Sequence, residues 1–240
     1  MIVRNLQLVR DRITTACVAA GRNPASVRLL AVSKTCAAGA VIDAIAGGQL
    51  AFGENYIAEG VEKITSLRAL NANLPEETLE TLDTLAWHCI GPVQSNKTRL
   101  VAENFQWVQS VDRLKIAQRL SEQRPAHLPP LQVCLQINLD GGVNKSGVEP
   151  ADVMALALEV AQLARLNLRG LMTIPEPAIN FEAACAVFAK AKAVFDQLNA
   201  SGVLPVPMDT LSMGMTQDLE AAIHSGSTLV RVGTAIFGPR

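Results

Sequence analysis

Hydrophobic residues recur along the chain in short apolar runs that are separated by amphipathic segments. The N-terminal segment places Ile2, Leu6 and Val9 at helical spacing, and Gly21 and Pro24 follow it, which predicts an N-terminal amphipathic helix. The later apolar runs, rich in Val, Leu and Ala, predict strands of a buried sheet. We expect these strands at Val27–Ser33, Leu50–Gly53, Leu85–Ile90, Phe105–Val111, Leu131–Leu139, Leu168–Ile174, Thr210–Met213 and Thr228–Val232. Helical patterns lie between them at Ala38–Ala46, around Val61 and Ile64, and at Gln94–Glu103, Arg113–Gln123, Ala151–Leu166, Phe181–Asn199 and Gln217–His224.

The predicted order is eight strands, each except the last followed by a helix. This alternation is typical of a parallel sheet that is covered by helices. Eight such units and a length of 240 residues suit a closed (β/α)8 barrel. A doubly wound open sheet is the alternative, but its G-x-G-x-x-G fingerprint is missing after the first strand. We therefore predict an α/β fold, a single (β/α)8 TIM barrel domain over residues 1–240, with an extra N-terminal helix and a loop or insertion around Asn71–Pro75.

The composition suits a large aliphatic core and argues against several classes of protein. Hydrophobic residues make up 49% of the chain, charged residues 18% and aromatic residues 4%, and the net charge is −1, which predicts no nucleic-acid surface. No apolar run reaches the ~18 residues of a membrane span, and the N-terminus lacks the pattern of a secretory signal. Five cysteines without a Cys-x-x-Cys pair predict reduced thiols. We expect a cytoplasmic protein without a metal site, and a monomer because no long exposed apolar stripe stands out.

Lys34 closes the apolar run Leu29–Ser33, so it stands where a buried strand ends. In a barrel the active site lies at the carboxyl ends of the strands. Partial burial lowers the pKa of an ammonium group and frees the amine to attack carbonyl groups, which is the basis of Schiff-base lysines. The alternative is a strand-end lysine whose amine reaches water.

Other polar residues and glycines also follow predicted strands, and each has a structural explanation of its own. His88 on an apolar strand is often a hydrogen-bonded core residue, and Arg231 could pair with Glu54. Ser212 and Thr234 could cap helices. Three glycines could serve turns that need a positive φ angle: Gly91, Gly214 and Gly233.

The combination of these residues favours a phosphate site. Ser212 follows the seventh strand, and Gly233 and Thr234 follow the eighth, where barrels commonly bind phosphate. The first and last strands are neighbours when a barrel closes, so Lys34 and Arg231 would line the same pocket. A Schiff-base lysine beside a phosphate site suggests pyridoxal 5′-phosphate (PLP) or a sugar-phosphate aldolase.

Longer strings carry a resemblance to a known family over essentially the whole chain. They are Ala31-Val32-Ser33-Lys34-Thr35, Phe52-Gly53-Glu54-Asn55-Tyr56, Trp87-His88-x-Ile90-Gly91-x-x-Gln94-Ser95-Asn96-Lys97, Lys145-Ser146-Gly147, Gly170-Leu171-Met172, Leu211-Ser212-Met213-Gly214-Met215 and Arg231-Val232-Gly233-Thr234-Ala235-Ile236-Phe237-Gly238. On these strings the chain resembles the PLP homeostasis protein family, whose members resemble the barrel domain of alanine racemase without its second domain. The chain departs from the family's usual residues at Cys89, at Pro92-Val93 and at Thr216.

The resemblance implies a barrel of the alanine racemase N-terminal domain type that binds PLP. The cofactor contacts that it implies are an internal aldimine (Schiff base) at Lys34, the pyridine nitrogen at Arg231, the ring at Asn55 and His88, and the phosphate at Ser212, Gly233 and Thr234. The Lys145 loop and the pair Asn96-Lys97 match the family pattern without a role that we can assign.

The residue expected at the pyridine nitrogen, Arg231, distinguishes a carrier of PLP from a PLP-dependent enzyme. Arginine is always charged and can only donate, so at the pyridine nitrogen it would weaken carbanion stabilisation by the cofactor. The first hypothesis is therefore a protein of PLP (vitamin B6) homeostasis that passes PLP to apo-enzymes without robust turnover. The alternative is an amino-acid racemase-like enzyme with Tyr56 or His88 as the base opposite Lys34, and an aldolase-like barrel without PLP is a third hypothesis.

Overall fold

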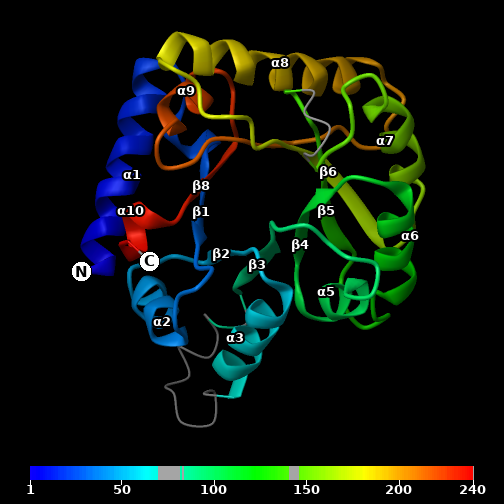
Figure 1. The fold of residues 1–240 in the computed structure, drawn as a ribbon, viewed down its shortest axis with the longest axis horizontal. Coiled ribbons are helices and arrows are strands. Elements are labelled where there is room, and N and C mark those ends of the chain that lie inside the picture. The colour runs from blue at the N-terminus through cyan, green and yellow to red at the C-terminus, as the bar shows by residue number, and fades with distance from the viewer. Residues whose placement is uncertain (70–81, 83, 141–145, 240) are drawn as a thin grey trace.

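The computed structural model describes residues 1–69, 82, 84–140 and 146–239. Parallel strands close into a barrel in the order β1-β2-β3-β4-β5-β6-β7-β8, which confirms the predicted topology (Figure 1). The strands are β1 (Arg28–Val32), β2 (Ala51–Glu54), β3 (Ala86–Cys89), β4 (Trp107–Val111), β5 (Leu131–Gln136), β6 (Leu166–Met172), β7 (Thr210–Ser212) and β8 (Leu229–Val232). The segment Asn71–Pro75 and Lys145 lie outside the described residues.

Helices surround the barrel and follow the strands in sequence (Figure 1). They are α1 (Ile2–Ala19), α2 (Ala38–Ala46), α3 (Ile57–Ala69), α5 (Thr98–Asn104), α6 (Leu114–Gln123), α7 (Val153–Ala161), α8 (Phe181–Ala200), α9 (Leu219–His224) and α10 (Thr234–Phe237), with a short 3-10 turn at Pro24–Ser26. The predicted N-terminal helix is α1, and it lies beside α9 and α10 at the closing end of the chain (Figure 1). The Asn5 side-chain amide donates to Ile236 O at 2.9 Å, and Arg12 pairs with Glu220 at 2.8 Å. These contacts join the first helix to the last barrel units.

Two layers of apolar side chains result from the alternation along the strands. One layer lies between the barrel and its helices and includes Ala31 and Phe52. A second, smaller cluster consists of Leu30, Val32, Ile90 and Leu229, which belong to the alternate positions and face the barrel interior. Residues that continue the inward positions beyond the strand ends therefore reach the carboxyl mouth of the barrel.

Several predicted boundaries differ from the structure, and the two largest differences lie in helices. The helix predicted at Ala151–Leu166 ends at Ala161, and Leu166 already belongs to β6. A turn follows the helix, and in it Leu166 N donates to Leu163 O. Both leucines pack on the core, so the apolar periodicity continues past the end of the helix. The helix predicted from Gln94 begins at Thr98, because residues 94–97 form a turn instead.

Candidate functional site

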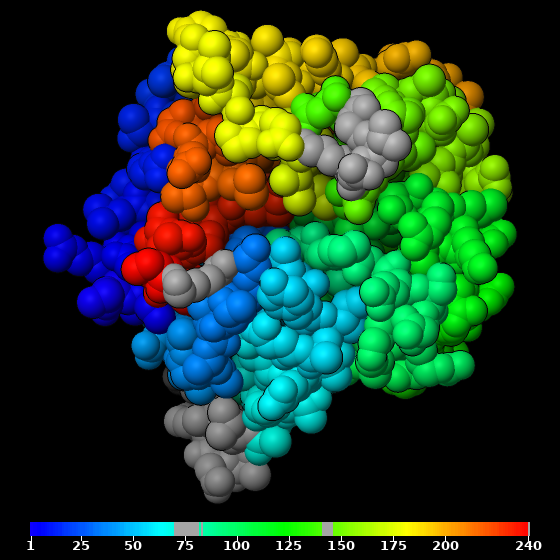
Figure 2. Space-filling model, viewed as in Figure 1, coloured from blue at the N-terminus to red at the C-terminus, as the bar shows by residue number. Residues whose placement is uncertain are grey.

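The carboxyl ends of the strands and the segments that follow them gather on the face shown in Figure 2. On this face the blue segment after β1, the cyan start of α3, the orange segment before α9 and the red α10 surround a central depression. Segments far apart in the chain therefore meet where a barrel site is expected.

Lys34 lies two residues beyond Val32, the end of β1, and is half-buried. It continues the inward positions Leu30 and Val32, so the backbone directs it toward the barrel mouth. On the neighbouring strand β8, Arg231 is the register partner of Leu30, four residues before Lys34. The prediction that Lys34 and Arg231 come from adjacent strands is confirmed.

A chain of hydrogen bonds crosses the barrel interior from Arg231. Its guanidinium donates to Ser212 Oγ at 2.6 Å, Ser212 Oγ donates to Gln109 Oε1 at 2.6 Å, and Gln109 Nε2 lies 2.8 Å from His88 Nδ1. The same guanidinium donates to the carbonyl oxygens of Ser212 and Thr173, both at 2.8 Å. The structure thus brings together three predicted residues, His88, Ser212 and Arg231, through a fourth that the sequence did not single out.

Arg231 is 3% exposed, and burial lowers its pKa to about 10. It therefore keeps its charge at neutral pH, although its hydrogen-bond acceptors are neutral. Among the described residues, no carboxylate lies within ion-pair distance of it, and the sequence-based alternative of a pair with Glu54 is wrong. Glu54 faces α3 instead and pairs with Lys63 at 2.6 Å. A buried guanidinium without a carboxylate suits an acceptor ligand in the barrel mouth.

His88 is a buried, hydrogen-bonded residue, as the structural explanation of its sequence position expected. The residue is 2% exposed, and its ring stacks on Trp107 with centroids 5.0 Å apart. Burial, and secondarily the charge of Arg28, lower the pKa of His88 to about 3, so its imidazole is neutral at physiological pH.

Asn55, at the end of β2, offers the site an unused polar group. Its side-chain oxygen Oδ1 is buried and has no hydrogen-bond partner among the described residues. Gly91 passes so close that an added Cβ would meet Asn55 O at 2.1 Å, so the role of Gly91 is close approach and not a positive φ angle. An orphaned buried acceptor beside the barrel mouth suits a ligand that carries a donor.

The segments after β7 and β8 form the opposite side of the mouth. Gly214 has φ +94°, as predicted for a turn glycine, whereas Gly233 has φ −114° and directly precedes α10. A cavity of ≈ 560 Å³ lies beside them and includes Thr234. Its other lining residues come mainly from the segments 175–184 and 215–221. Ser212 is fully buried and bonded inside the barrel, so its hydroxyl does not line this cavity in the present arrangement.

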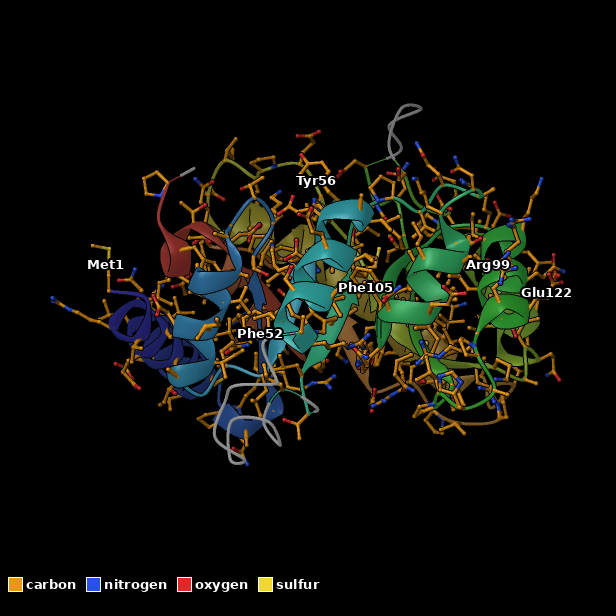
Figure 3. The ribbon with its side chains drawn as sticks, turned by 90° about the horizontal axis from the view of Figure 1, so that it is seen from below. Met1, Phe52, Tyr56, Arg99, Phe105 and Glu122 are labelled. Carbon is orange, nitrogen blue, oxygen red and sulfur yellow. The ribbon has the colours of Figure 1, made fainter. Side chains whose placement is uncertain are left out.

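Tyr56 lies away from the barrel interior. The residue is 59% exposed, and Figure 3 shows it at the edge of the molecule beside the start of α3. Phe105, which is fully buried, lies instead in the layer under α3 in the same view.

Sequence reasoning missed Gln109 and the charged cluster beside β1. Gln109 is an amide at an inward position of the apolar strand Trp107–Val111, and this position was a usable signal. Lys63 is 5% exposed, but its helical spacing resembles that of a surface charge. Only the packing of α3 against β2 and its contact with Ser33, directly after β1, make Lys63 an interior residue.

The fold and the buried site agree with a known class of barrel. The family model described as alanine racemase, N-terminal domain, matches residues 5–240. The pyridoxal phosphate homeostasis protein of Pseudomonas aeruginosa is 55% identical over 239 residues, covering 100% of this chain and 96% of the relative. The protein of the same name from Escherichia coli K12 is 49% identical over 240 residues, covering 100% and 97%. The chain belongs to the pyridoxal phosphate homeostasis protein family.

Solved structures agree with this assignment. PipY of Synechococcus elongatus with PLP bound has a TM-score of 0.81 at 34% identity, and the match covers 99% of this chain and 100% of that one. An alanine racemase of Clostridium difficile shares the fold at 17% identity and a TM-score of 0.68, and the match covers 57% of its length.

Two further observations concern metals and membranes. Within residues 1–69, 82, 84–140 and 146–239, no group of three or more His, Cys, Asp or Glu side chains could hold a metal ion. None of the helices in that part of the chain is both long and apolar enough to cross a membrane.

Proposed function

We propose that this protein binds PLP at the barrel mouth, carries it as a Schiff base on Lys34 and takes part in PLP homeostasis. The observation that carries the proposal is the placement of half-buried Lys34 beyond β1, next to strand β8 with its buried Arg231. The name of the chain's relatives, pyridoxal phosphate homeostasis protein, and the PLP-bound PipY structure support the choice of cofactor.

The residues present fit PLP. The buried guanidinium of Arg231 would donate to the pyridine nitrogen, and the orphaned Oδ1 of Asn55 is an acceptor near the ring. Neutral His88, held by Gln109, would contribute to the surroundings of the ring. Gly233 and Thr234, at the start of α10, would hold the phosphate together with Ser212. To donate to the phosphate, Ser212 would have to redirect its single hydroxyl proton, because this proton is donated to Gln109 Oε1 in the structure.

The same residues favour a carrier over an enzyme. When bound, PLP supplies an aldehyde that captures amines and a ring that withdraws electrons from them. Arg231 only donates, so the ring nitrogen would stay unprotonated and this withdrawal would be weak. His88 Nδ1 is already occupied by Gln109, and the exposed Tyr56 lies at the outer edge of the mouth. Neither residue is placed as a base opposite Lys34, so the racemase-like alternative is not favoured.

The proposal extends to location and partners. We propose a cytoplasmic monomer made of one barrel domain over residues 1–240 that hands PLP to apo-enzymes. The free cysteines support a reducing compartment: Cys17, Cys36, Cys89, Cys134 and Cys185.

The visible absorption spectrum of the purified protein tests the proposal. Wild type mixed with PLP is expected to develop the band of a PLP–lysine Schiff base, and Lys34→Ala is expected to lose it. Lys97→Ala is the matched control and is expected to keep the band. Borohydride reduction followed by peptide mapping locates the modified lysine, and a band that survives in Lys34→Ala would place the attachment on another lysine.

A further inference from the structure

The residue after Lys34 has an unfavourable backbone conformation. Thr35 has φ +62°, and no other described residue except glycines has a positive φ angle. For a β-branched residue this left-handed conformation is sterically costly and persists only where surrounding contacts hold it. The turn that carries Lys34 is therefore held in place from outside.

A charged cluster supplies the contacts. The Thr35 backbone N–H donates to Glu59 Oε1 at 2.5 Å, in the first turn of α3. Lys63 Nζ donates to the same Glu59 oxygen at 3.2 Å and to Glu54 Oε1 at 2.6 Å. We call Glu54, Glu59 and Lys63 the α3 clamp.

The clamp also holds the residue before Lys34. Lys63 Nζ donates to Ser33 O at 2.7 Å, and Ser33 Oγ donates to Glu54 Oε1 at 2.6 Å. The three N–H groups of Lys63 thus have three acceptors, Ser33 O, Glu54 and Glu59. The backbone on both sides of Lys34 is bound to one cluster, while the clamp lies on the helix side of the barrel and Lys34 continues the inward side.

The burial of Glu54 and Lys63, two of the three clamp residues, points to a positioning role. Glu54 is fully buried, and the Lys63 side chain is 4% exposed. A buried ion pair contributes little net stability over apolar residues of similar volume, because both charges lose their hydration. Breaking the pair is costly, because it leaves a buried charge without its partner, so the pair opposes movement of the groups that it holds.

We propose that the α3 clamp positions Lys34 for attachment of PLP by holding Ser33 and Thr35. Glu59, Glu54 and Lys63 are then positioning residues that do not touch the cofactor. The inference rests on the proposed function, because it assigns the clamp a role only toward Lys34.

The test compares two ligands that differ in the aldehyde. PLP binds through both the pocket and Lys34, whereas pyridoxine 5′-phosphate has no aldehyde and binds through the pocket alone. In Glu59→Ala, the affinity for PLP is expected to fall about tenfold, the order expected for a lost hydrogen bond to a charged group. The affinity for pyridoxine 5′-phosphate, measured by titration calorimetry, is expected to stay within about twofold of wild type.

Matched variants isolate the contact. Glu62 is an exposed residue of the same helix, and Glu62→Ala is expected to bind both ligands like wild type. Glu59→Gln keeps an acceptor for Thr35 N and is expected to restore most of the PLP affinity. Thr35→Gly removes the steric cost of the positive φ angle at this position. In that background, Glu59→Ala is expected to reduce the affinity for PLP much less than it does in wild type.

The outcomes separate the clamp from the proposed function. If wild type forms no Schiff base on Lys34, the proposed function fails. If wild type forms it and Glu59→Ala binds PLP as tightly as Glu62→Ala, only the clamp fails. Equal losses for both ligands would also overturn the clamp, because they indicate a damaged pocket. Hydrogen exchange in wild type gives an independent check, since the Thr35 amide is expected to exchange slowly and fast exchange would contradict its bond to Glu59.

Discussion

Gln109 Nε2 lies 2.8 Å from His88 Nδ1, and this contact determines which ring nitrogen of the buried histidine accepts a hydrogen bond. Ser212 donates to Gln109 Oε1, so the amide nitrogen must face the imidazole, and Nδ1 must accept. In a cationic His88, Nδ1 would also carry a hydrogen, and this N–H would face the N–H of Gln109 with no acceptor between them. Hydrogen bonding and burial therefore act in the same direction, and the barrel interior holds its positive charge on Arg231.

His88 is expected to make folding stability dependent on pH. Its folded pKa of about 3 is below the ordinary value of 6.5, so between these values the unfolded chain binds more protons. Stability is therefore lost as the pH falls through this window, by up to about 1.4 kcal/mol per pH unit. Urea unfolding from pH 7 to pH 4 is expected to show a smaller slope in His88→Asn than in wild type. The control is His127→Asn at an exposed position, which is expected to keep the wild-type slope. An unchanged slope in His88→Asn would contradict the buried neutral state of His88.

Replacement of Gln109 is expected to destabilise the fold. Gln109→Leu removes the acceptor of the buried Ser212 hydroxyl and the donor to His88, at an expected cost of about 1–3 kcal/mol. Denaturant unfolding measures this cost, and Gln7→Leu on the exposed face of α1 is expected to change stability by less than about 0.5 kcal/mol. Equal stability of both variants would show that the hydrogen-bond chain contributes nothing.

Gly91→Ala is expected to displace Asn55. The added Cβ would lie 2.1 Å from Asn55 O, so the backbone must shift, at an expected cost of about 1–3 kcal/mol. Gly39→Ala, in α2 where an added Cβ meets nothing within 4 Å, is expected to stabilise by up to about 1 kcal/mol. Thermal unfolding measures both variants, and a neutral Gly91→Ala would mean that the two loops separate without cost.

Arg231→Lys is expected to weaken PLP binding by about tenfold. The planar guanidinium of Arg231 donates to two carbonyl oxygens and would also reach the ring, whereas the compact ammonium group of lysine cannot make all three contacts. Equilibrium titration with PLP measures the effect. Arg169→Lys, which alters an ion pair with Asp209 outside the mouth, is the matched control and is expected to bind normally. Wild-type affinity in Arg231→Lys would remove Arg231 from the cofactor site.

Much of the fold could be predicted because apolar runs and helical periodicity are local signals. The runs that end at Ser33 and Val232 indicated the first and last strands, and their pairing follows from barrel closure. The helix end at Ala161 could not be predicted, because Leu163 and Leu166 serve the core from a turn and a strand. A residue's burial depends on its neighbours in space and not on its helical phase alone.

The sequence by itself determined the class of fold, the position of Lys34 at a strand end, and the family. Only the tertiary structure decided the partners of the charged residues: Glu54 pairs with Lys63 and not with Arg231. The physical reason is that β2 directs Glu54 toward α3, whereas β8 directs Arg231 into the barrel interior. Strands of one sheet can direct their charged side chains to opposite faces of that sheet, and the order of residues along the chain does not record which charges meet.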